Sequence, residues 1–234
     1  MLSPFFMYVF IGTCFVFYPI NSYDSSEKQI IANQYVRLIH STGCIYSLLP
    51  ILYHNPPTII DVNHTPIPEE VIRVFDRTIS FFLWDCIALL LSNEKEKTLF
   101  ISHHLLSVAN IGISRYFGFN WYLMCIALFL GEITNPLTQV SDFYEITNVQ
   151  NIAFEKVYFY SMLISRGFLI PLIIISYLHN IHYHYVMVRT MIYLYQLTLL
   201  FNLVSMNLIT IGSVTWLHKK YLVLYKNNND KKMS

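Results

Sequence analysis

The stretch that decides the fold is "TLFISHHLLSVANIG", residues Thr98 to Gly112, which places two adjacent histidines inside a mostly apolar run. Apolar runs of this kind are typical of membrane-spanning helices. An ionisable side chain inside a bilayer is costly unless it faces protein or water, so such residues are candidates for function. His103 and His104 are therefore the first candidate site residues.

The whole chain is unusually apolar. Of its 234 residues, 55% are hydrophobic and 12% are charged, and the mean hydropathy is +0.45. These values lie outside the usual range of soluble domains and predict an integral membrane protein. The net charge is +1, and no basic stripe is present that could neutralise a nucleic-acid backbone. We therefore expect membrane lipids, and beyond them other membrane proteins, as partners, and no nucleic acid.

Apolar runs long enough to cross a bilayer predict about seven helices. They cover residues 3–20, 34–53, 75–91, 98–117, 121–139, 157–178 and 190–217. The first could be a signal peptide, but no positive residue precedes it and no clear cleavage site follows, so we expect a retained helix. Pro50, Pro136 and Pro171 interrupt their segments, which is tolerated where neighbouring helices bind the freed carbonyls. The predicted class is an all-α polytopic membrane protein.

Helical spacing places polar side chains on one face of several of these segments. Residues that share a face are His103, Ser107, Asn110 and Ser114; Glu132, Asn135 and Gln139; and His40, Cys44 and Ser47. Asp85 and Arg166 lie in two further segments. If the faces converge, they enclose a polar cavity in which Arg166 balances Asp85 or Glu132. Polar residues also join transmembrane helices through hydrogen bonds, and that alternative stays open.

The two histidines cannot both point to the centre of such a cavity, because adjacent helical residues are about 100° apart. We expect one to face the cavity and the other a neighbouring helix. The four cysteines lie in apolar stretches with no C-x-x-C pair and no Cys/His ligand spacing. We therefore expect no metal site and no disulfide framework.

Positive residues predict a cytosolic carboxyl terminus. With that orientation, Lys28, Arg37, Lys95, Lys97, Lys156 and the lysines after residue 218 face the cytosol, and Arg73, Arg77, Arg115 and Arg189 face the other side. The same topology makes Asn63, in the triplet "NHT", a lumenal glycosylation candidate. The terminal "KKMS" resembles a dilysine signal for the endoplasmic reticulum, although a basic tail that merely stays in the cytosol is the alternative.

Five segments resemble, in order and spacing, the TLC (TRAM/LAG1/CLN8) domain family. They are "RLIHSTGCIYSLLP", "SFFLWDCIALLL", "EKEKTLFISHHLLSVANIG", "LFLGEITNPLTQVSD" and "FYSMLISRGFLIP". The resemblance covers about residues 27–224 and implies a bundle of six transmembrane helices around a polar, lipid-accessible cavity, preceded by one amino-terminal helix. The expected domains are an amino-terminal hydrophobic segment at 1–26, the TLC domain at 27–224 and a basic tail at 225–234.

The ceramide synthase branch of this family transfers an acyl group from acyl-CoA to an amine, with a histidine pair and a downstream acidic element. The pair maps onto His103 and His104, and the acidic element maps onto Gly131, Glu132 and Asn135, so one acid is kept and the other is replaced by an amide. The variant "GEITNP" looks more like the less characterised TLC members, which influence membrane lipid composition or carry cargo.

Three functions remain in view. The first is lipid binding, sensing or membrane lipid homeostasis, with His40, Asp85, Ser107, Asn110, Asn135 and Arg166 lining the cavity. The alternative is an N-acyltransferase with His103 or His104 as base or nucleophile, Glu132 as orienter and acyl-CoA as co-substrate, without other cofactors. A transporter or trafficking factor is third, but no inverted pair of broken helices is visible. The abundance of Ile, Tyr and Asn is typical of AT-rich genomes, and if the protein is viral its membrane is the host's.

Overall fold

A computed structural model describes residues 25–54, 66–92, 97–118, 121–147, 151–172 and 192–233. Within these ranges the chain is almost entirely helical and contains no strand. The prediction of an all-α protein is therefore confirmed for the described residues. The first predicted helix and the sequon at Asn63 lie outside them, and the proposed domain bounds stay a prediction.

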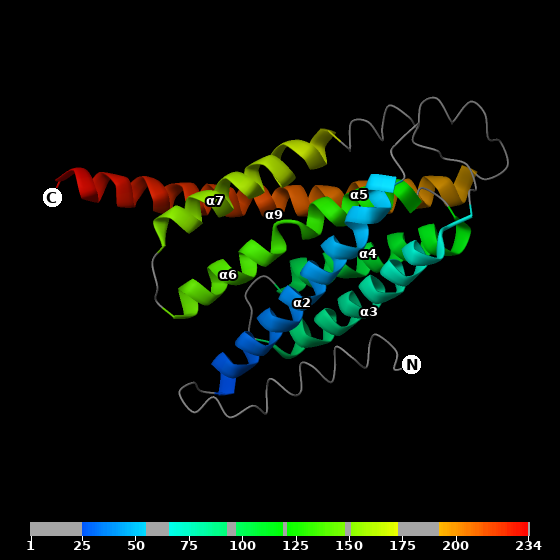
Figure 1. Ribbon diagram of the computed structural model, residues 1–234, viewed down its shortest axis with the longest axis horizontal. Helices are drawn as coiled ribbons and strands as arrows, with labels where there is room; N and C mark the ends of the chain where they lie inside the picture. The colour runs from blue at the N-terminus through cyan, green and yellow to red at the C-terminus, as the bar shows by residue number, and fades with distance from the viewer. Residues whose placement is uncertain are drawn as a thin grey trace.

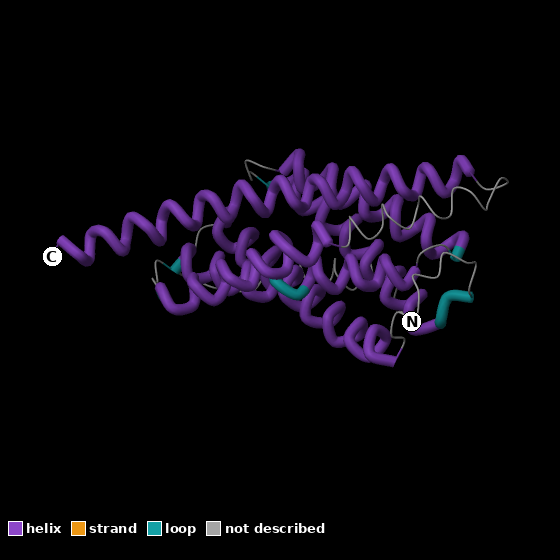
Figure 2. Tube along the Cα trace, turned by 90° about the horizontal axis from the view of Figure 1, so that it is seen from above, coloured by secondary structure: helices purple, strands orange, loops and turns teal. Residues whose placement is uncertain are grey.

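The helices follow the predicted apolar segments but are longer or broken at particular residues. Their bounds are α2 Ser25–His54, α3 Glu69–Leu91, α4 Lys97–Phe117, α5 Trp121–Glu132, α6 Asn135–Ile146, α7 Ile152–Met162, η1 Leu163–Leu169 and α9 Ile192–Met233. The element η1 is a π-helical stretch that continues α7. The helix α9 extends through the segment predicted to be a polar tail, and its last part projects beyond the other helices (Figures 1 and 2).

Contacts between neighbouring helices close into a ring. The helix α3 packs against α2 and α4, α4 packs against α9, and α9 packs against α7 and η1. The ring closes because η1 contacts α5, α7 contacts α6, and both α5 and α6 contact α2. Amphipathic helices arranged in a ring can enclose side chains of a different character from those on the outside.

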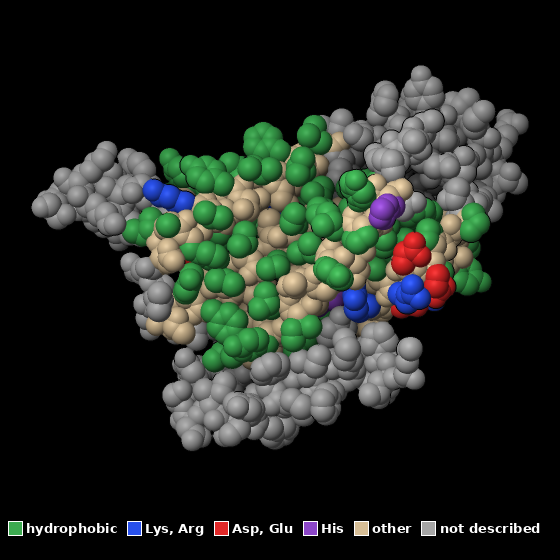
Figure 3. Space-filling model, in the orientation of Figure 1, with side chains coloured by type: hydrophobic (Ala, Val, Ile, Leu, Met, Phe, Trp, Pro, Cys, Tyr) green, Lys and Arg blue, Asp and Glu red, His purple; other side chains and the backbone are tan. Residues whose placement is uncertain are grey.

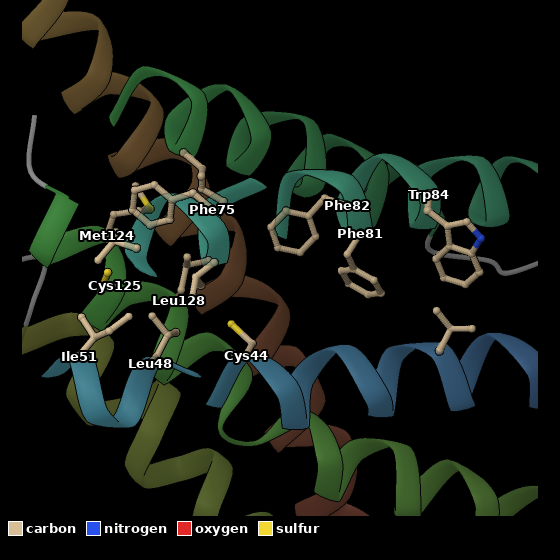
Figure 4. Packing of buried hydrophobic residues seen from close by; sticks show 14 of the residues in the cluster. Cys44, Leu48, Ile51, Phe75, Phe81, Phe82, Trp84, Met124, Cys125 and Leu128 are labelled. Carbon is tan, nitrogen blue, oxygen red and sulfur yellow. The ribbon is translucent and has the colours of Figure 1, made fainter. Parts of the chain in front are cut away.

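One end of the ring is filled by apolar side chains. Leu48 and Ile51 from α2 meet Phe75 from α3 and Met124 and Cys125 from α5, as Figure 4 shows. All of these side chains are buried. Ile111 and Leu128 belong to the same cluster. Because α4 also contacts α5 across the ring, these residues close one end of the bundle, while the rest of the cluster continues along α3 through Phe81, Phe82 and Trp84. We call the closed end the apolar end.

The predicted helix at 121–139 is interrupted at Ile133–Thr134, between α5 and α6. Pro136 explains the interruption, since proline has no N–H to donate and its ring clashes with the preceding turn. Two carbonyls at the break are bound by η1: Ser165 Oγ donates to Leu130 O at 2.8 Å, and Arg166 Nη2 donates to Gly131 O at 2.9 Å. A neighbouring helix thus binds two carbonyls at the break, next to the Glu132 carbonyl that Pro136 leaves without its helical donor.

Large apolar side chains cover much of the outer surface. Figure 3 shows one face on which hydrophobic groups are spread over most of the described area. Among the described residues, the stretch Trp121–Tyr144 is the single one that is long and apolar enough to cross a membrane by itself, with a mean hydropathy of 1.3. Inward-facing polar residues lower the hydropathy of the other helices. How many helices span the membrane therefore stays a prediction.

Candidate functional site

The ring encloses a pocket of about 440 Å³. At the apolar end its wall includes Ile111, Met124 and Leu128. From there it extends towards the amino-terminal part of α4, where Leu99 and Phe100 line it. Every helix of the ring contributes lining residues, so the polar faces predicted on separate helices do converge on one space.

A histidine paired with a carboxylate lies on one wall of the pocket. His104 Nε2 is 2.8 Å from Asp85 Oδ2, and Asp85 Oδ1 accepts a hydrogen bond of 3.0 Å from Arg37 Nε. Asp85 is nearly inaccessible to solvent, so the ion pair with Arg37 compensates its charge where water cannot. The carboxylate also fixes the orientation of the imidazole. Phe82 stacks on the other side of that ring, at 4.7 Å between centroids.

The second histidine lies beside the first. The ring centroids of His103 and His104 are 5.5 Å apart, and both residues line the pocket. The expectation that only one histidine faces the pocket therefore differs from the geometry: both line it, and His104 in addition bonds to Asp85 on the neighbouring helix α3. The buried Nδ1 atoms of both histidines have no hydrogen-bond partner within the described residues, so a ligand could bind to either atom.

A second polar group surrounds the break between α5 and α6. Asn135 Nδ2 donates to Glu132 Oε2 at 2.9 Å, and Arg166 Nη2 donates to Asn135 Oδ1 at 2.6 Å. All three residues line the pocket. Arg166 was expected to balance Asp85 or Glu132; its charge does interact with the Glu132 carboxylate, while its hydrogen bonds go to Asn135 and to the Gly131 carbonyl. The positive charge that compensates Asp85 comes from Arg37, which lies one turn before His40 on α2.

Two sequence predictions differ from the geometry. His40 does not line the pocket; its ring is buried behind the wall, stacked on Phe81 at 3.8 Å and 3.9 Å from Glu132 Oε1. The residues of α2 that line the pocket are Gln34, Arg37 and Ser41. Their face is offset by one residue, about 100° around the helix, from the predicted face of His40. Glu132, predicted to orient the histidine pair, lies by Asn135, and Asp85 is the acid that contacts His104.

The remaining predicted residues fall as expected or outside the pocket. Ser107, Asn110, Asn135 and Gln139 line it, and Ser107 Oγ lies 3.3 Å from Ser205 Oγ on α9. Ser114 is fully buried away from the pocket. Arg37 and Asp142 line it and were not predicted. Asp142 accepts a 2.8 Å hydrogen bond from Gln34, and a helical step of seven from Asn135 was the signal that could have found it.

Among the described residues, no group of three or more His, Cys, Asp and Glu side chains is placed to hold a metal ion. The polar groups of the pocket instead offer hydrogen bonds: imidazole nitrogens, carboxylate and amide oxygens, and the guanidinium of Arg166. An arrangement of this kind suits an organic ligand with one polar part and one apolar part.

A ring of helices with an apolar surface and a polar interior pocket is the architecture of a helical membrane protein. The TLC domain model of the TRAM/LAG1/CLN8 family matches residues 30–214, and the chain belongs to this family. It is therefore a membrane protein with a lipid-related function. No curated protein matches the sequence.

Proposed function

We propose that the protein binds a membrane lipid in the central pocket and acts in lipid binding, sensing or membrane lipid homeostasis. The observation that supports this proposal is the division of the pocket. Apolar residues such as Ile111, Met124 and Leu128 form one end, and the groups around Asp85, His104 and Arg166 lie further along. A lipid matches this division, since its acyl chain avoids polar surface and its headgroup requires it.

The size of the pocket supports a ligand larger than a headgroup alone. About 440 Å³ lies within the range of small-molecule pockets and can hold a polar group with part of an acyl chain. No cofactor is part of this proposal. The lysines at the carboxyl terminus support residence in the endoplasmic reticulum as a further part of it, with membrane lipids, and other membrane proteins, as partners.

One observation favours a second candidate function, N-acyl transfer. Asp85 holds His104 through its Nε2 atom, at 2.8 Å. If Nε2 carries the ring proton and donates a hydrogen bond to the carboxylate, Nδ1 is left as a base with no partner among the described residues. A histidine oriented by a carboxylate is a common general base.

In that reaction an amine nitrogen forms a bond to the carbonyl carbon of an acyl-CoA thioester. The carbon–sulfur bond breaks, the amine proton passes to the imidazole, and the thiolate leaves and takes up a proton. Because acyl-CoA is the co-substrate, both the amine and the thioester would have to reach His103 or His104. Arg166 could stabilise the negative charge that develops on the carbonyl oxygen.

The experiment compares total lipid profiles of cells that express the wild-type chain with cells that express the His103→Ala/His104→Ala variant at equal abundance. Ser114→Ala, at a buried serine away from the pocket, serves as the matched control. Lipids that copurify with each protein are identified in parallel.

For lipid binding, we expect a lipid class to copurify with the wild type and the control and to be depleted in the double variant. A histidine-dependent rise in one amide-linked class in the cells would instead support acyl transfer. If no lipid copurifies with the wild type above the level of an unrelated membrane protein, the proposed lipid binding is wrong.

A further inference from the structure

A second, smaller recess lies on the outside of the ring, between α2 and α3. It has a volume of about 340 Å³ and shares no residue with the central pocket. We call it the outer groove; its lining residues are Tyr46, Ser47, Pro50, Ile51, Glu70, Arg73, Val74 and Arg77. It lies at the apolar end, where α2 finishes and α3 begins.

Two guanidinium groups give one side of the outer groove a positive charge. Arg77 Nη2 donates to Gly43 O at 3.0 Å and to Ser47 Oγ at 2.9 Å, so this side chain is held against α2 in a fixed position. Arg73 lies one turn earlier on α3 and has no partner within the described residues. Arg77, which is fixed in this way, can bind phosphate oxygens with little loss of side-chain freedom, and Arg73 offers a second guanidinium group one turn away.

The nearest acid on the following turn does not neutralise them. Asp76 is engaged by Arg115, whose Nε and Nη2 atoms both donate to its carboxylate. This bidentate pair connects α3 to α4 and leaves Glu70 as the acidic residue that lines the groove. The groove therefore carries two positive charges and one negative charge on separate turns of α3.

The negative side of the groove suits a cation. Glu70 is exposed one turn before Arg73, and Tyr46 on the facing helix has 81% of its surface accessible. A carboxylate attracts an ammonium group, whereas the ring of Tyr46, next to the Ser47 that bonds to Arg77, adds an exposed apolar surface to the groove. Pro50, Ile51 and Val74 add an apolar wall that can contact the carbon atoms of a lipid.

We propose that the outer groove binds the headgroup of a zwitterionic phospholipid, with its phosphate on Arg73 and Arg77, its ammonium group on Glu70 and its carbon atoms against Tyr46, Pro50 and Val74. Charge complementarity selects this occupant, since a purely anionic headgroup would meet Glu70 and a purely cationic one would meet the arginines. Helix ends are also where headgroups lie in a bilayer. This site is separate from the central pocket, and it does not depend on the function proposed for that pocket.

The test uses the full chain, purified in a maltoside detergent, and native mass spectrometry to count bound lipid. The probes are dihexanoyl-phosphatidylcholine, dihexanoyl-phosphatidylglycerol, glycerophosphocholine and inorganic phosphate. The variants are Arg73→Gln, Tyr46→Ala and Glu70→Gln, all at exposed positions. Tyr53→Ala is the matched control for Tyr46, because it lies on the same helix, is 80% exposed and is not part of the groove. Lys156→Gln controls for loss of an exposed positive charge.

We expect Arg73→Gln and Tyr46→Ala each to weaken binding of one phosphatidylcholine about tenfold, with both controls unchanged. Glu70→Gln should remove the preference for phosphatidylcholine over phosphatidylglycerol while binding of phosphatidylglycerol is kept or strengthened. Any lipid in the central pocket is the same in all variants, so the difference isolates the outer groove.

Three outcomes would overturn the proposal. Equal binding by the variants and the controls would mean that the groove holds no lipid. A preference of the wild type for phosphatidylglycerol would indicate a site for anions alone. Displacement of phosphatidylcholine by inorganic phosphate as effectively as by glycerophosphocholine would indicate that the ammonium group is not recognised.

Discussion

The two ends of the ring are made by the same helices, yet they differ in every respect that matters for function. On α3, Phe75 packs into the apolar end, while Asp85, ten residues later, carries a charge into the pocket wall. On α4, Ile111 belongs to the apolar cluster and His104 to the polar group. On both helices the residues of the apolar end and those of the polar group are thus separated along the chain, and apolar packing continues beside the polar group through Phe81, Phe82 and Trp84.

The largest expected effect on stability comes from the ion pair at Asp85 in the pocket wall. Arg37→Met leaves the Asp85 carboxylate buried with His104 as its remaining partner, and breaking one partner of a buried pair costs about 3 kcal/mol. We expect a strongly lowered thermal midpoint in detergent, with the exposed Lys156→Met as control.

The double variant Arg37→Met/Asp85→Leu should recover much of that stability, because no uncompensated charge remains. If the thermal midpoint of Arg37→Met equals that of the control, the Arg37–Asp85 pair does not stabilise the fold. The polar group would then not differ from the apolar end in its electrostatic contribution to stability.

An intermediate effect is expected in the apolar half. Phe75→Ala removes a fully buried ring from the cluster and should lower the free energy of unfolding by about 3 kcal/mol, because a cavity remains. The lipid that copurifies should not change, since Phe75 does not line the pocket. Leu90→Ala, on the same helix but 62% exposed, is the control and should have little effect. A change in copurified lipid in Phe75→Ala alone would show that the two ends do not act separately.

The smallest effect concerns a hydrogen bond in the pocket wall. Tyr158 Oη donates to Thr138 Oγ1 at 3.0 Å, and Tyr158→Phe should cost about 1 kcal/mol. Differential scanning fluorimetry with Tyr160→Phe, at an exposed position, as reference can measure it. A loss above about 3 kcal/mol would indicate that the pocket wall depends on this bond far more than the packing suggests.

The sequence predicted the pocket best where one helix carries several polar residues in register. His103, Ser107 and Asn110 on α4, and Glu132, Asn135 and Gln139 across the α5–α6 break, all reach the same space. Here the period of the helix alone decides the face. Ser114 departs from this pattern, because the apolar cluster occupies that end of the ring.

On α2 the predicted pocket face was wrong, because the face that lines the pocket is turned about the helix axis from the predicted one. His40, Cys44 and Ser47 share a face, but that face packs against α3 and α5, and Gln34, Arg37 and Ser41 line the pocket. The count of positive residues places Arg37 on the cytosolic side, not in the pocket. Its partner, Asp85, is 48 residues away in the chain, and no local pattern can reveal such a pair.

The break between α5 and α6 also has a consequence for biogenesis. The carbonyls of Leu130 and Gly131 are bound by Ser165 and Arg166, each 35 residues further along the chain. While the polypeptide is being synthesised, these acceptors must therefore persist unsatisfied, or be served by water or a chaperone, until η1 arrives. The hydrogen bonds at the α5–α6 break therefore form only after η1 has been synthesised.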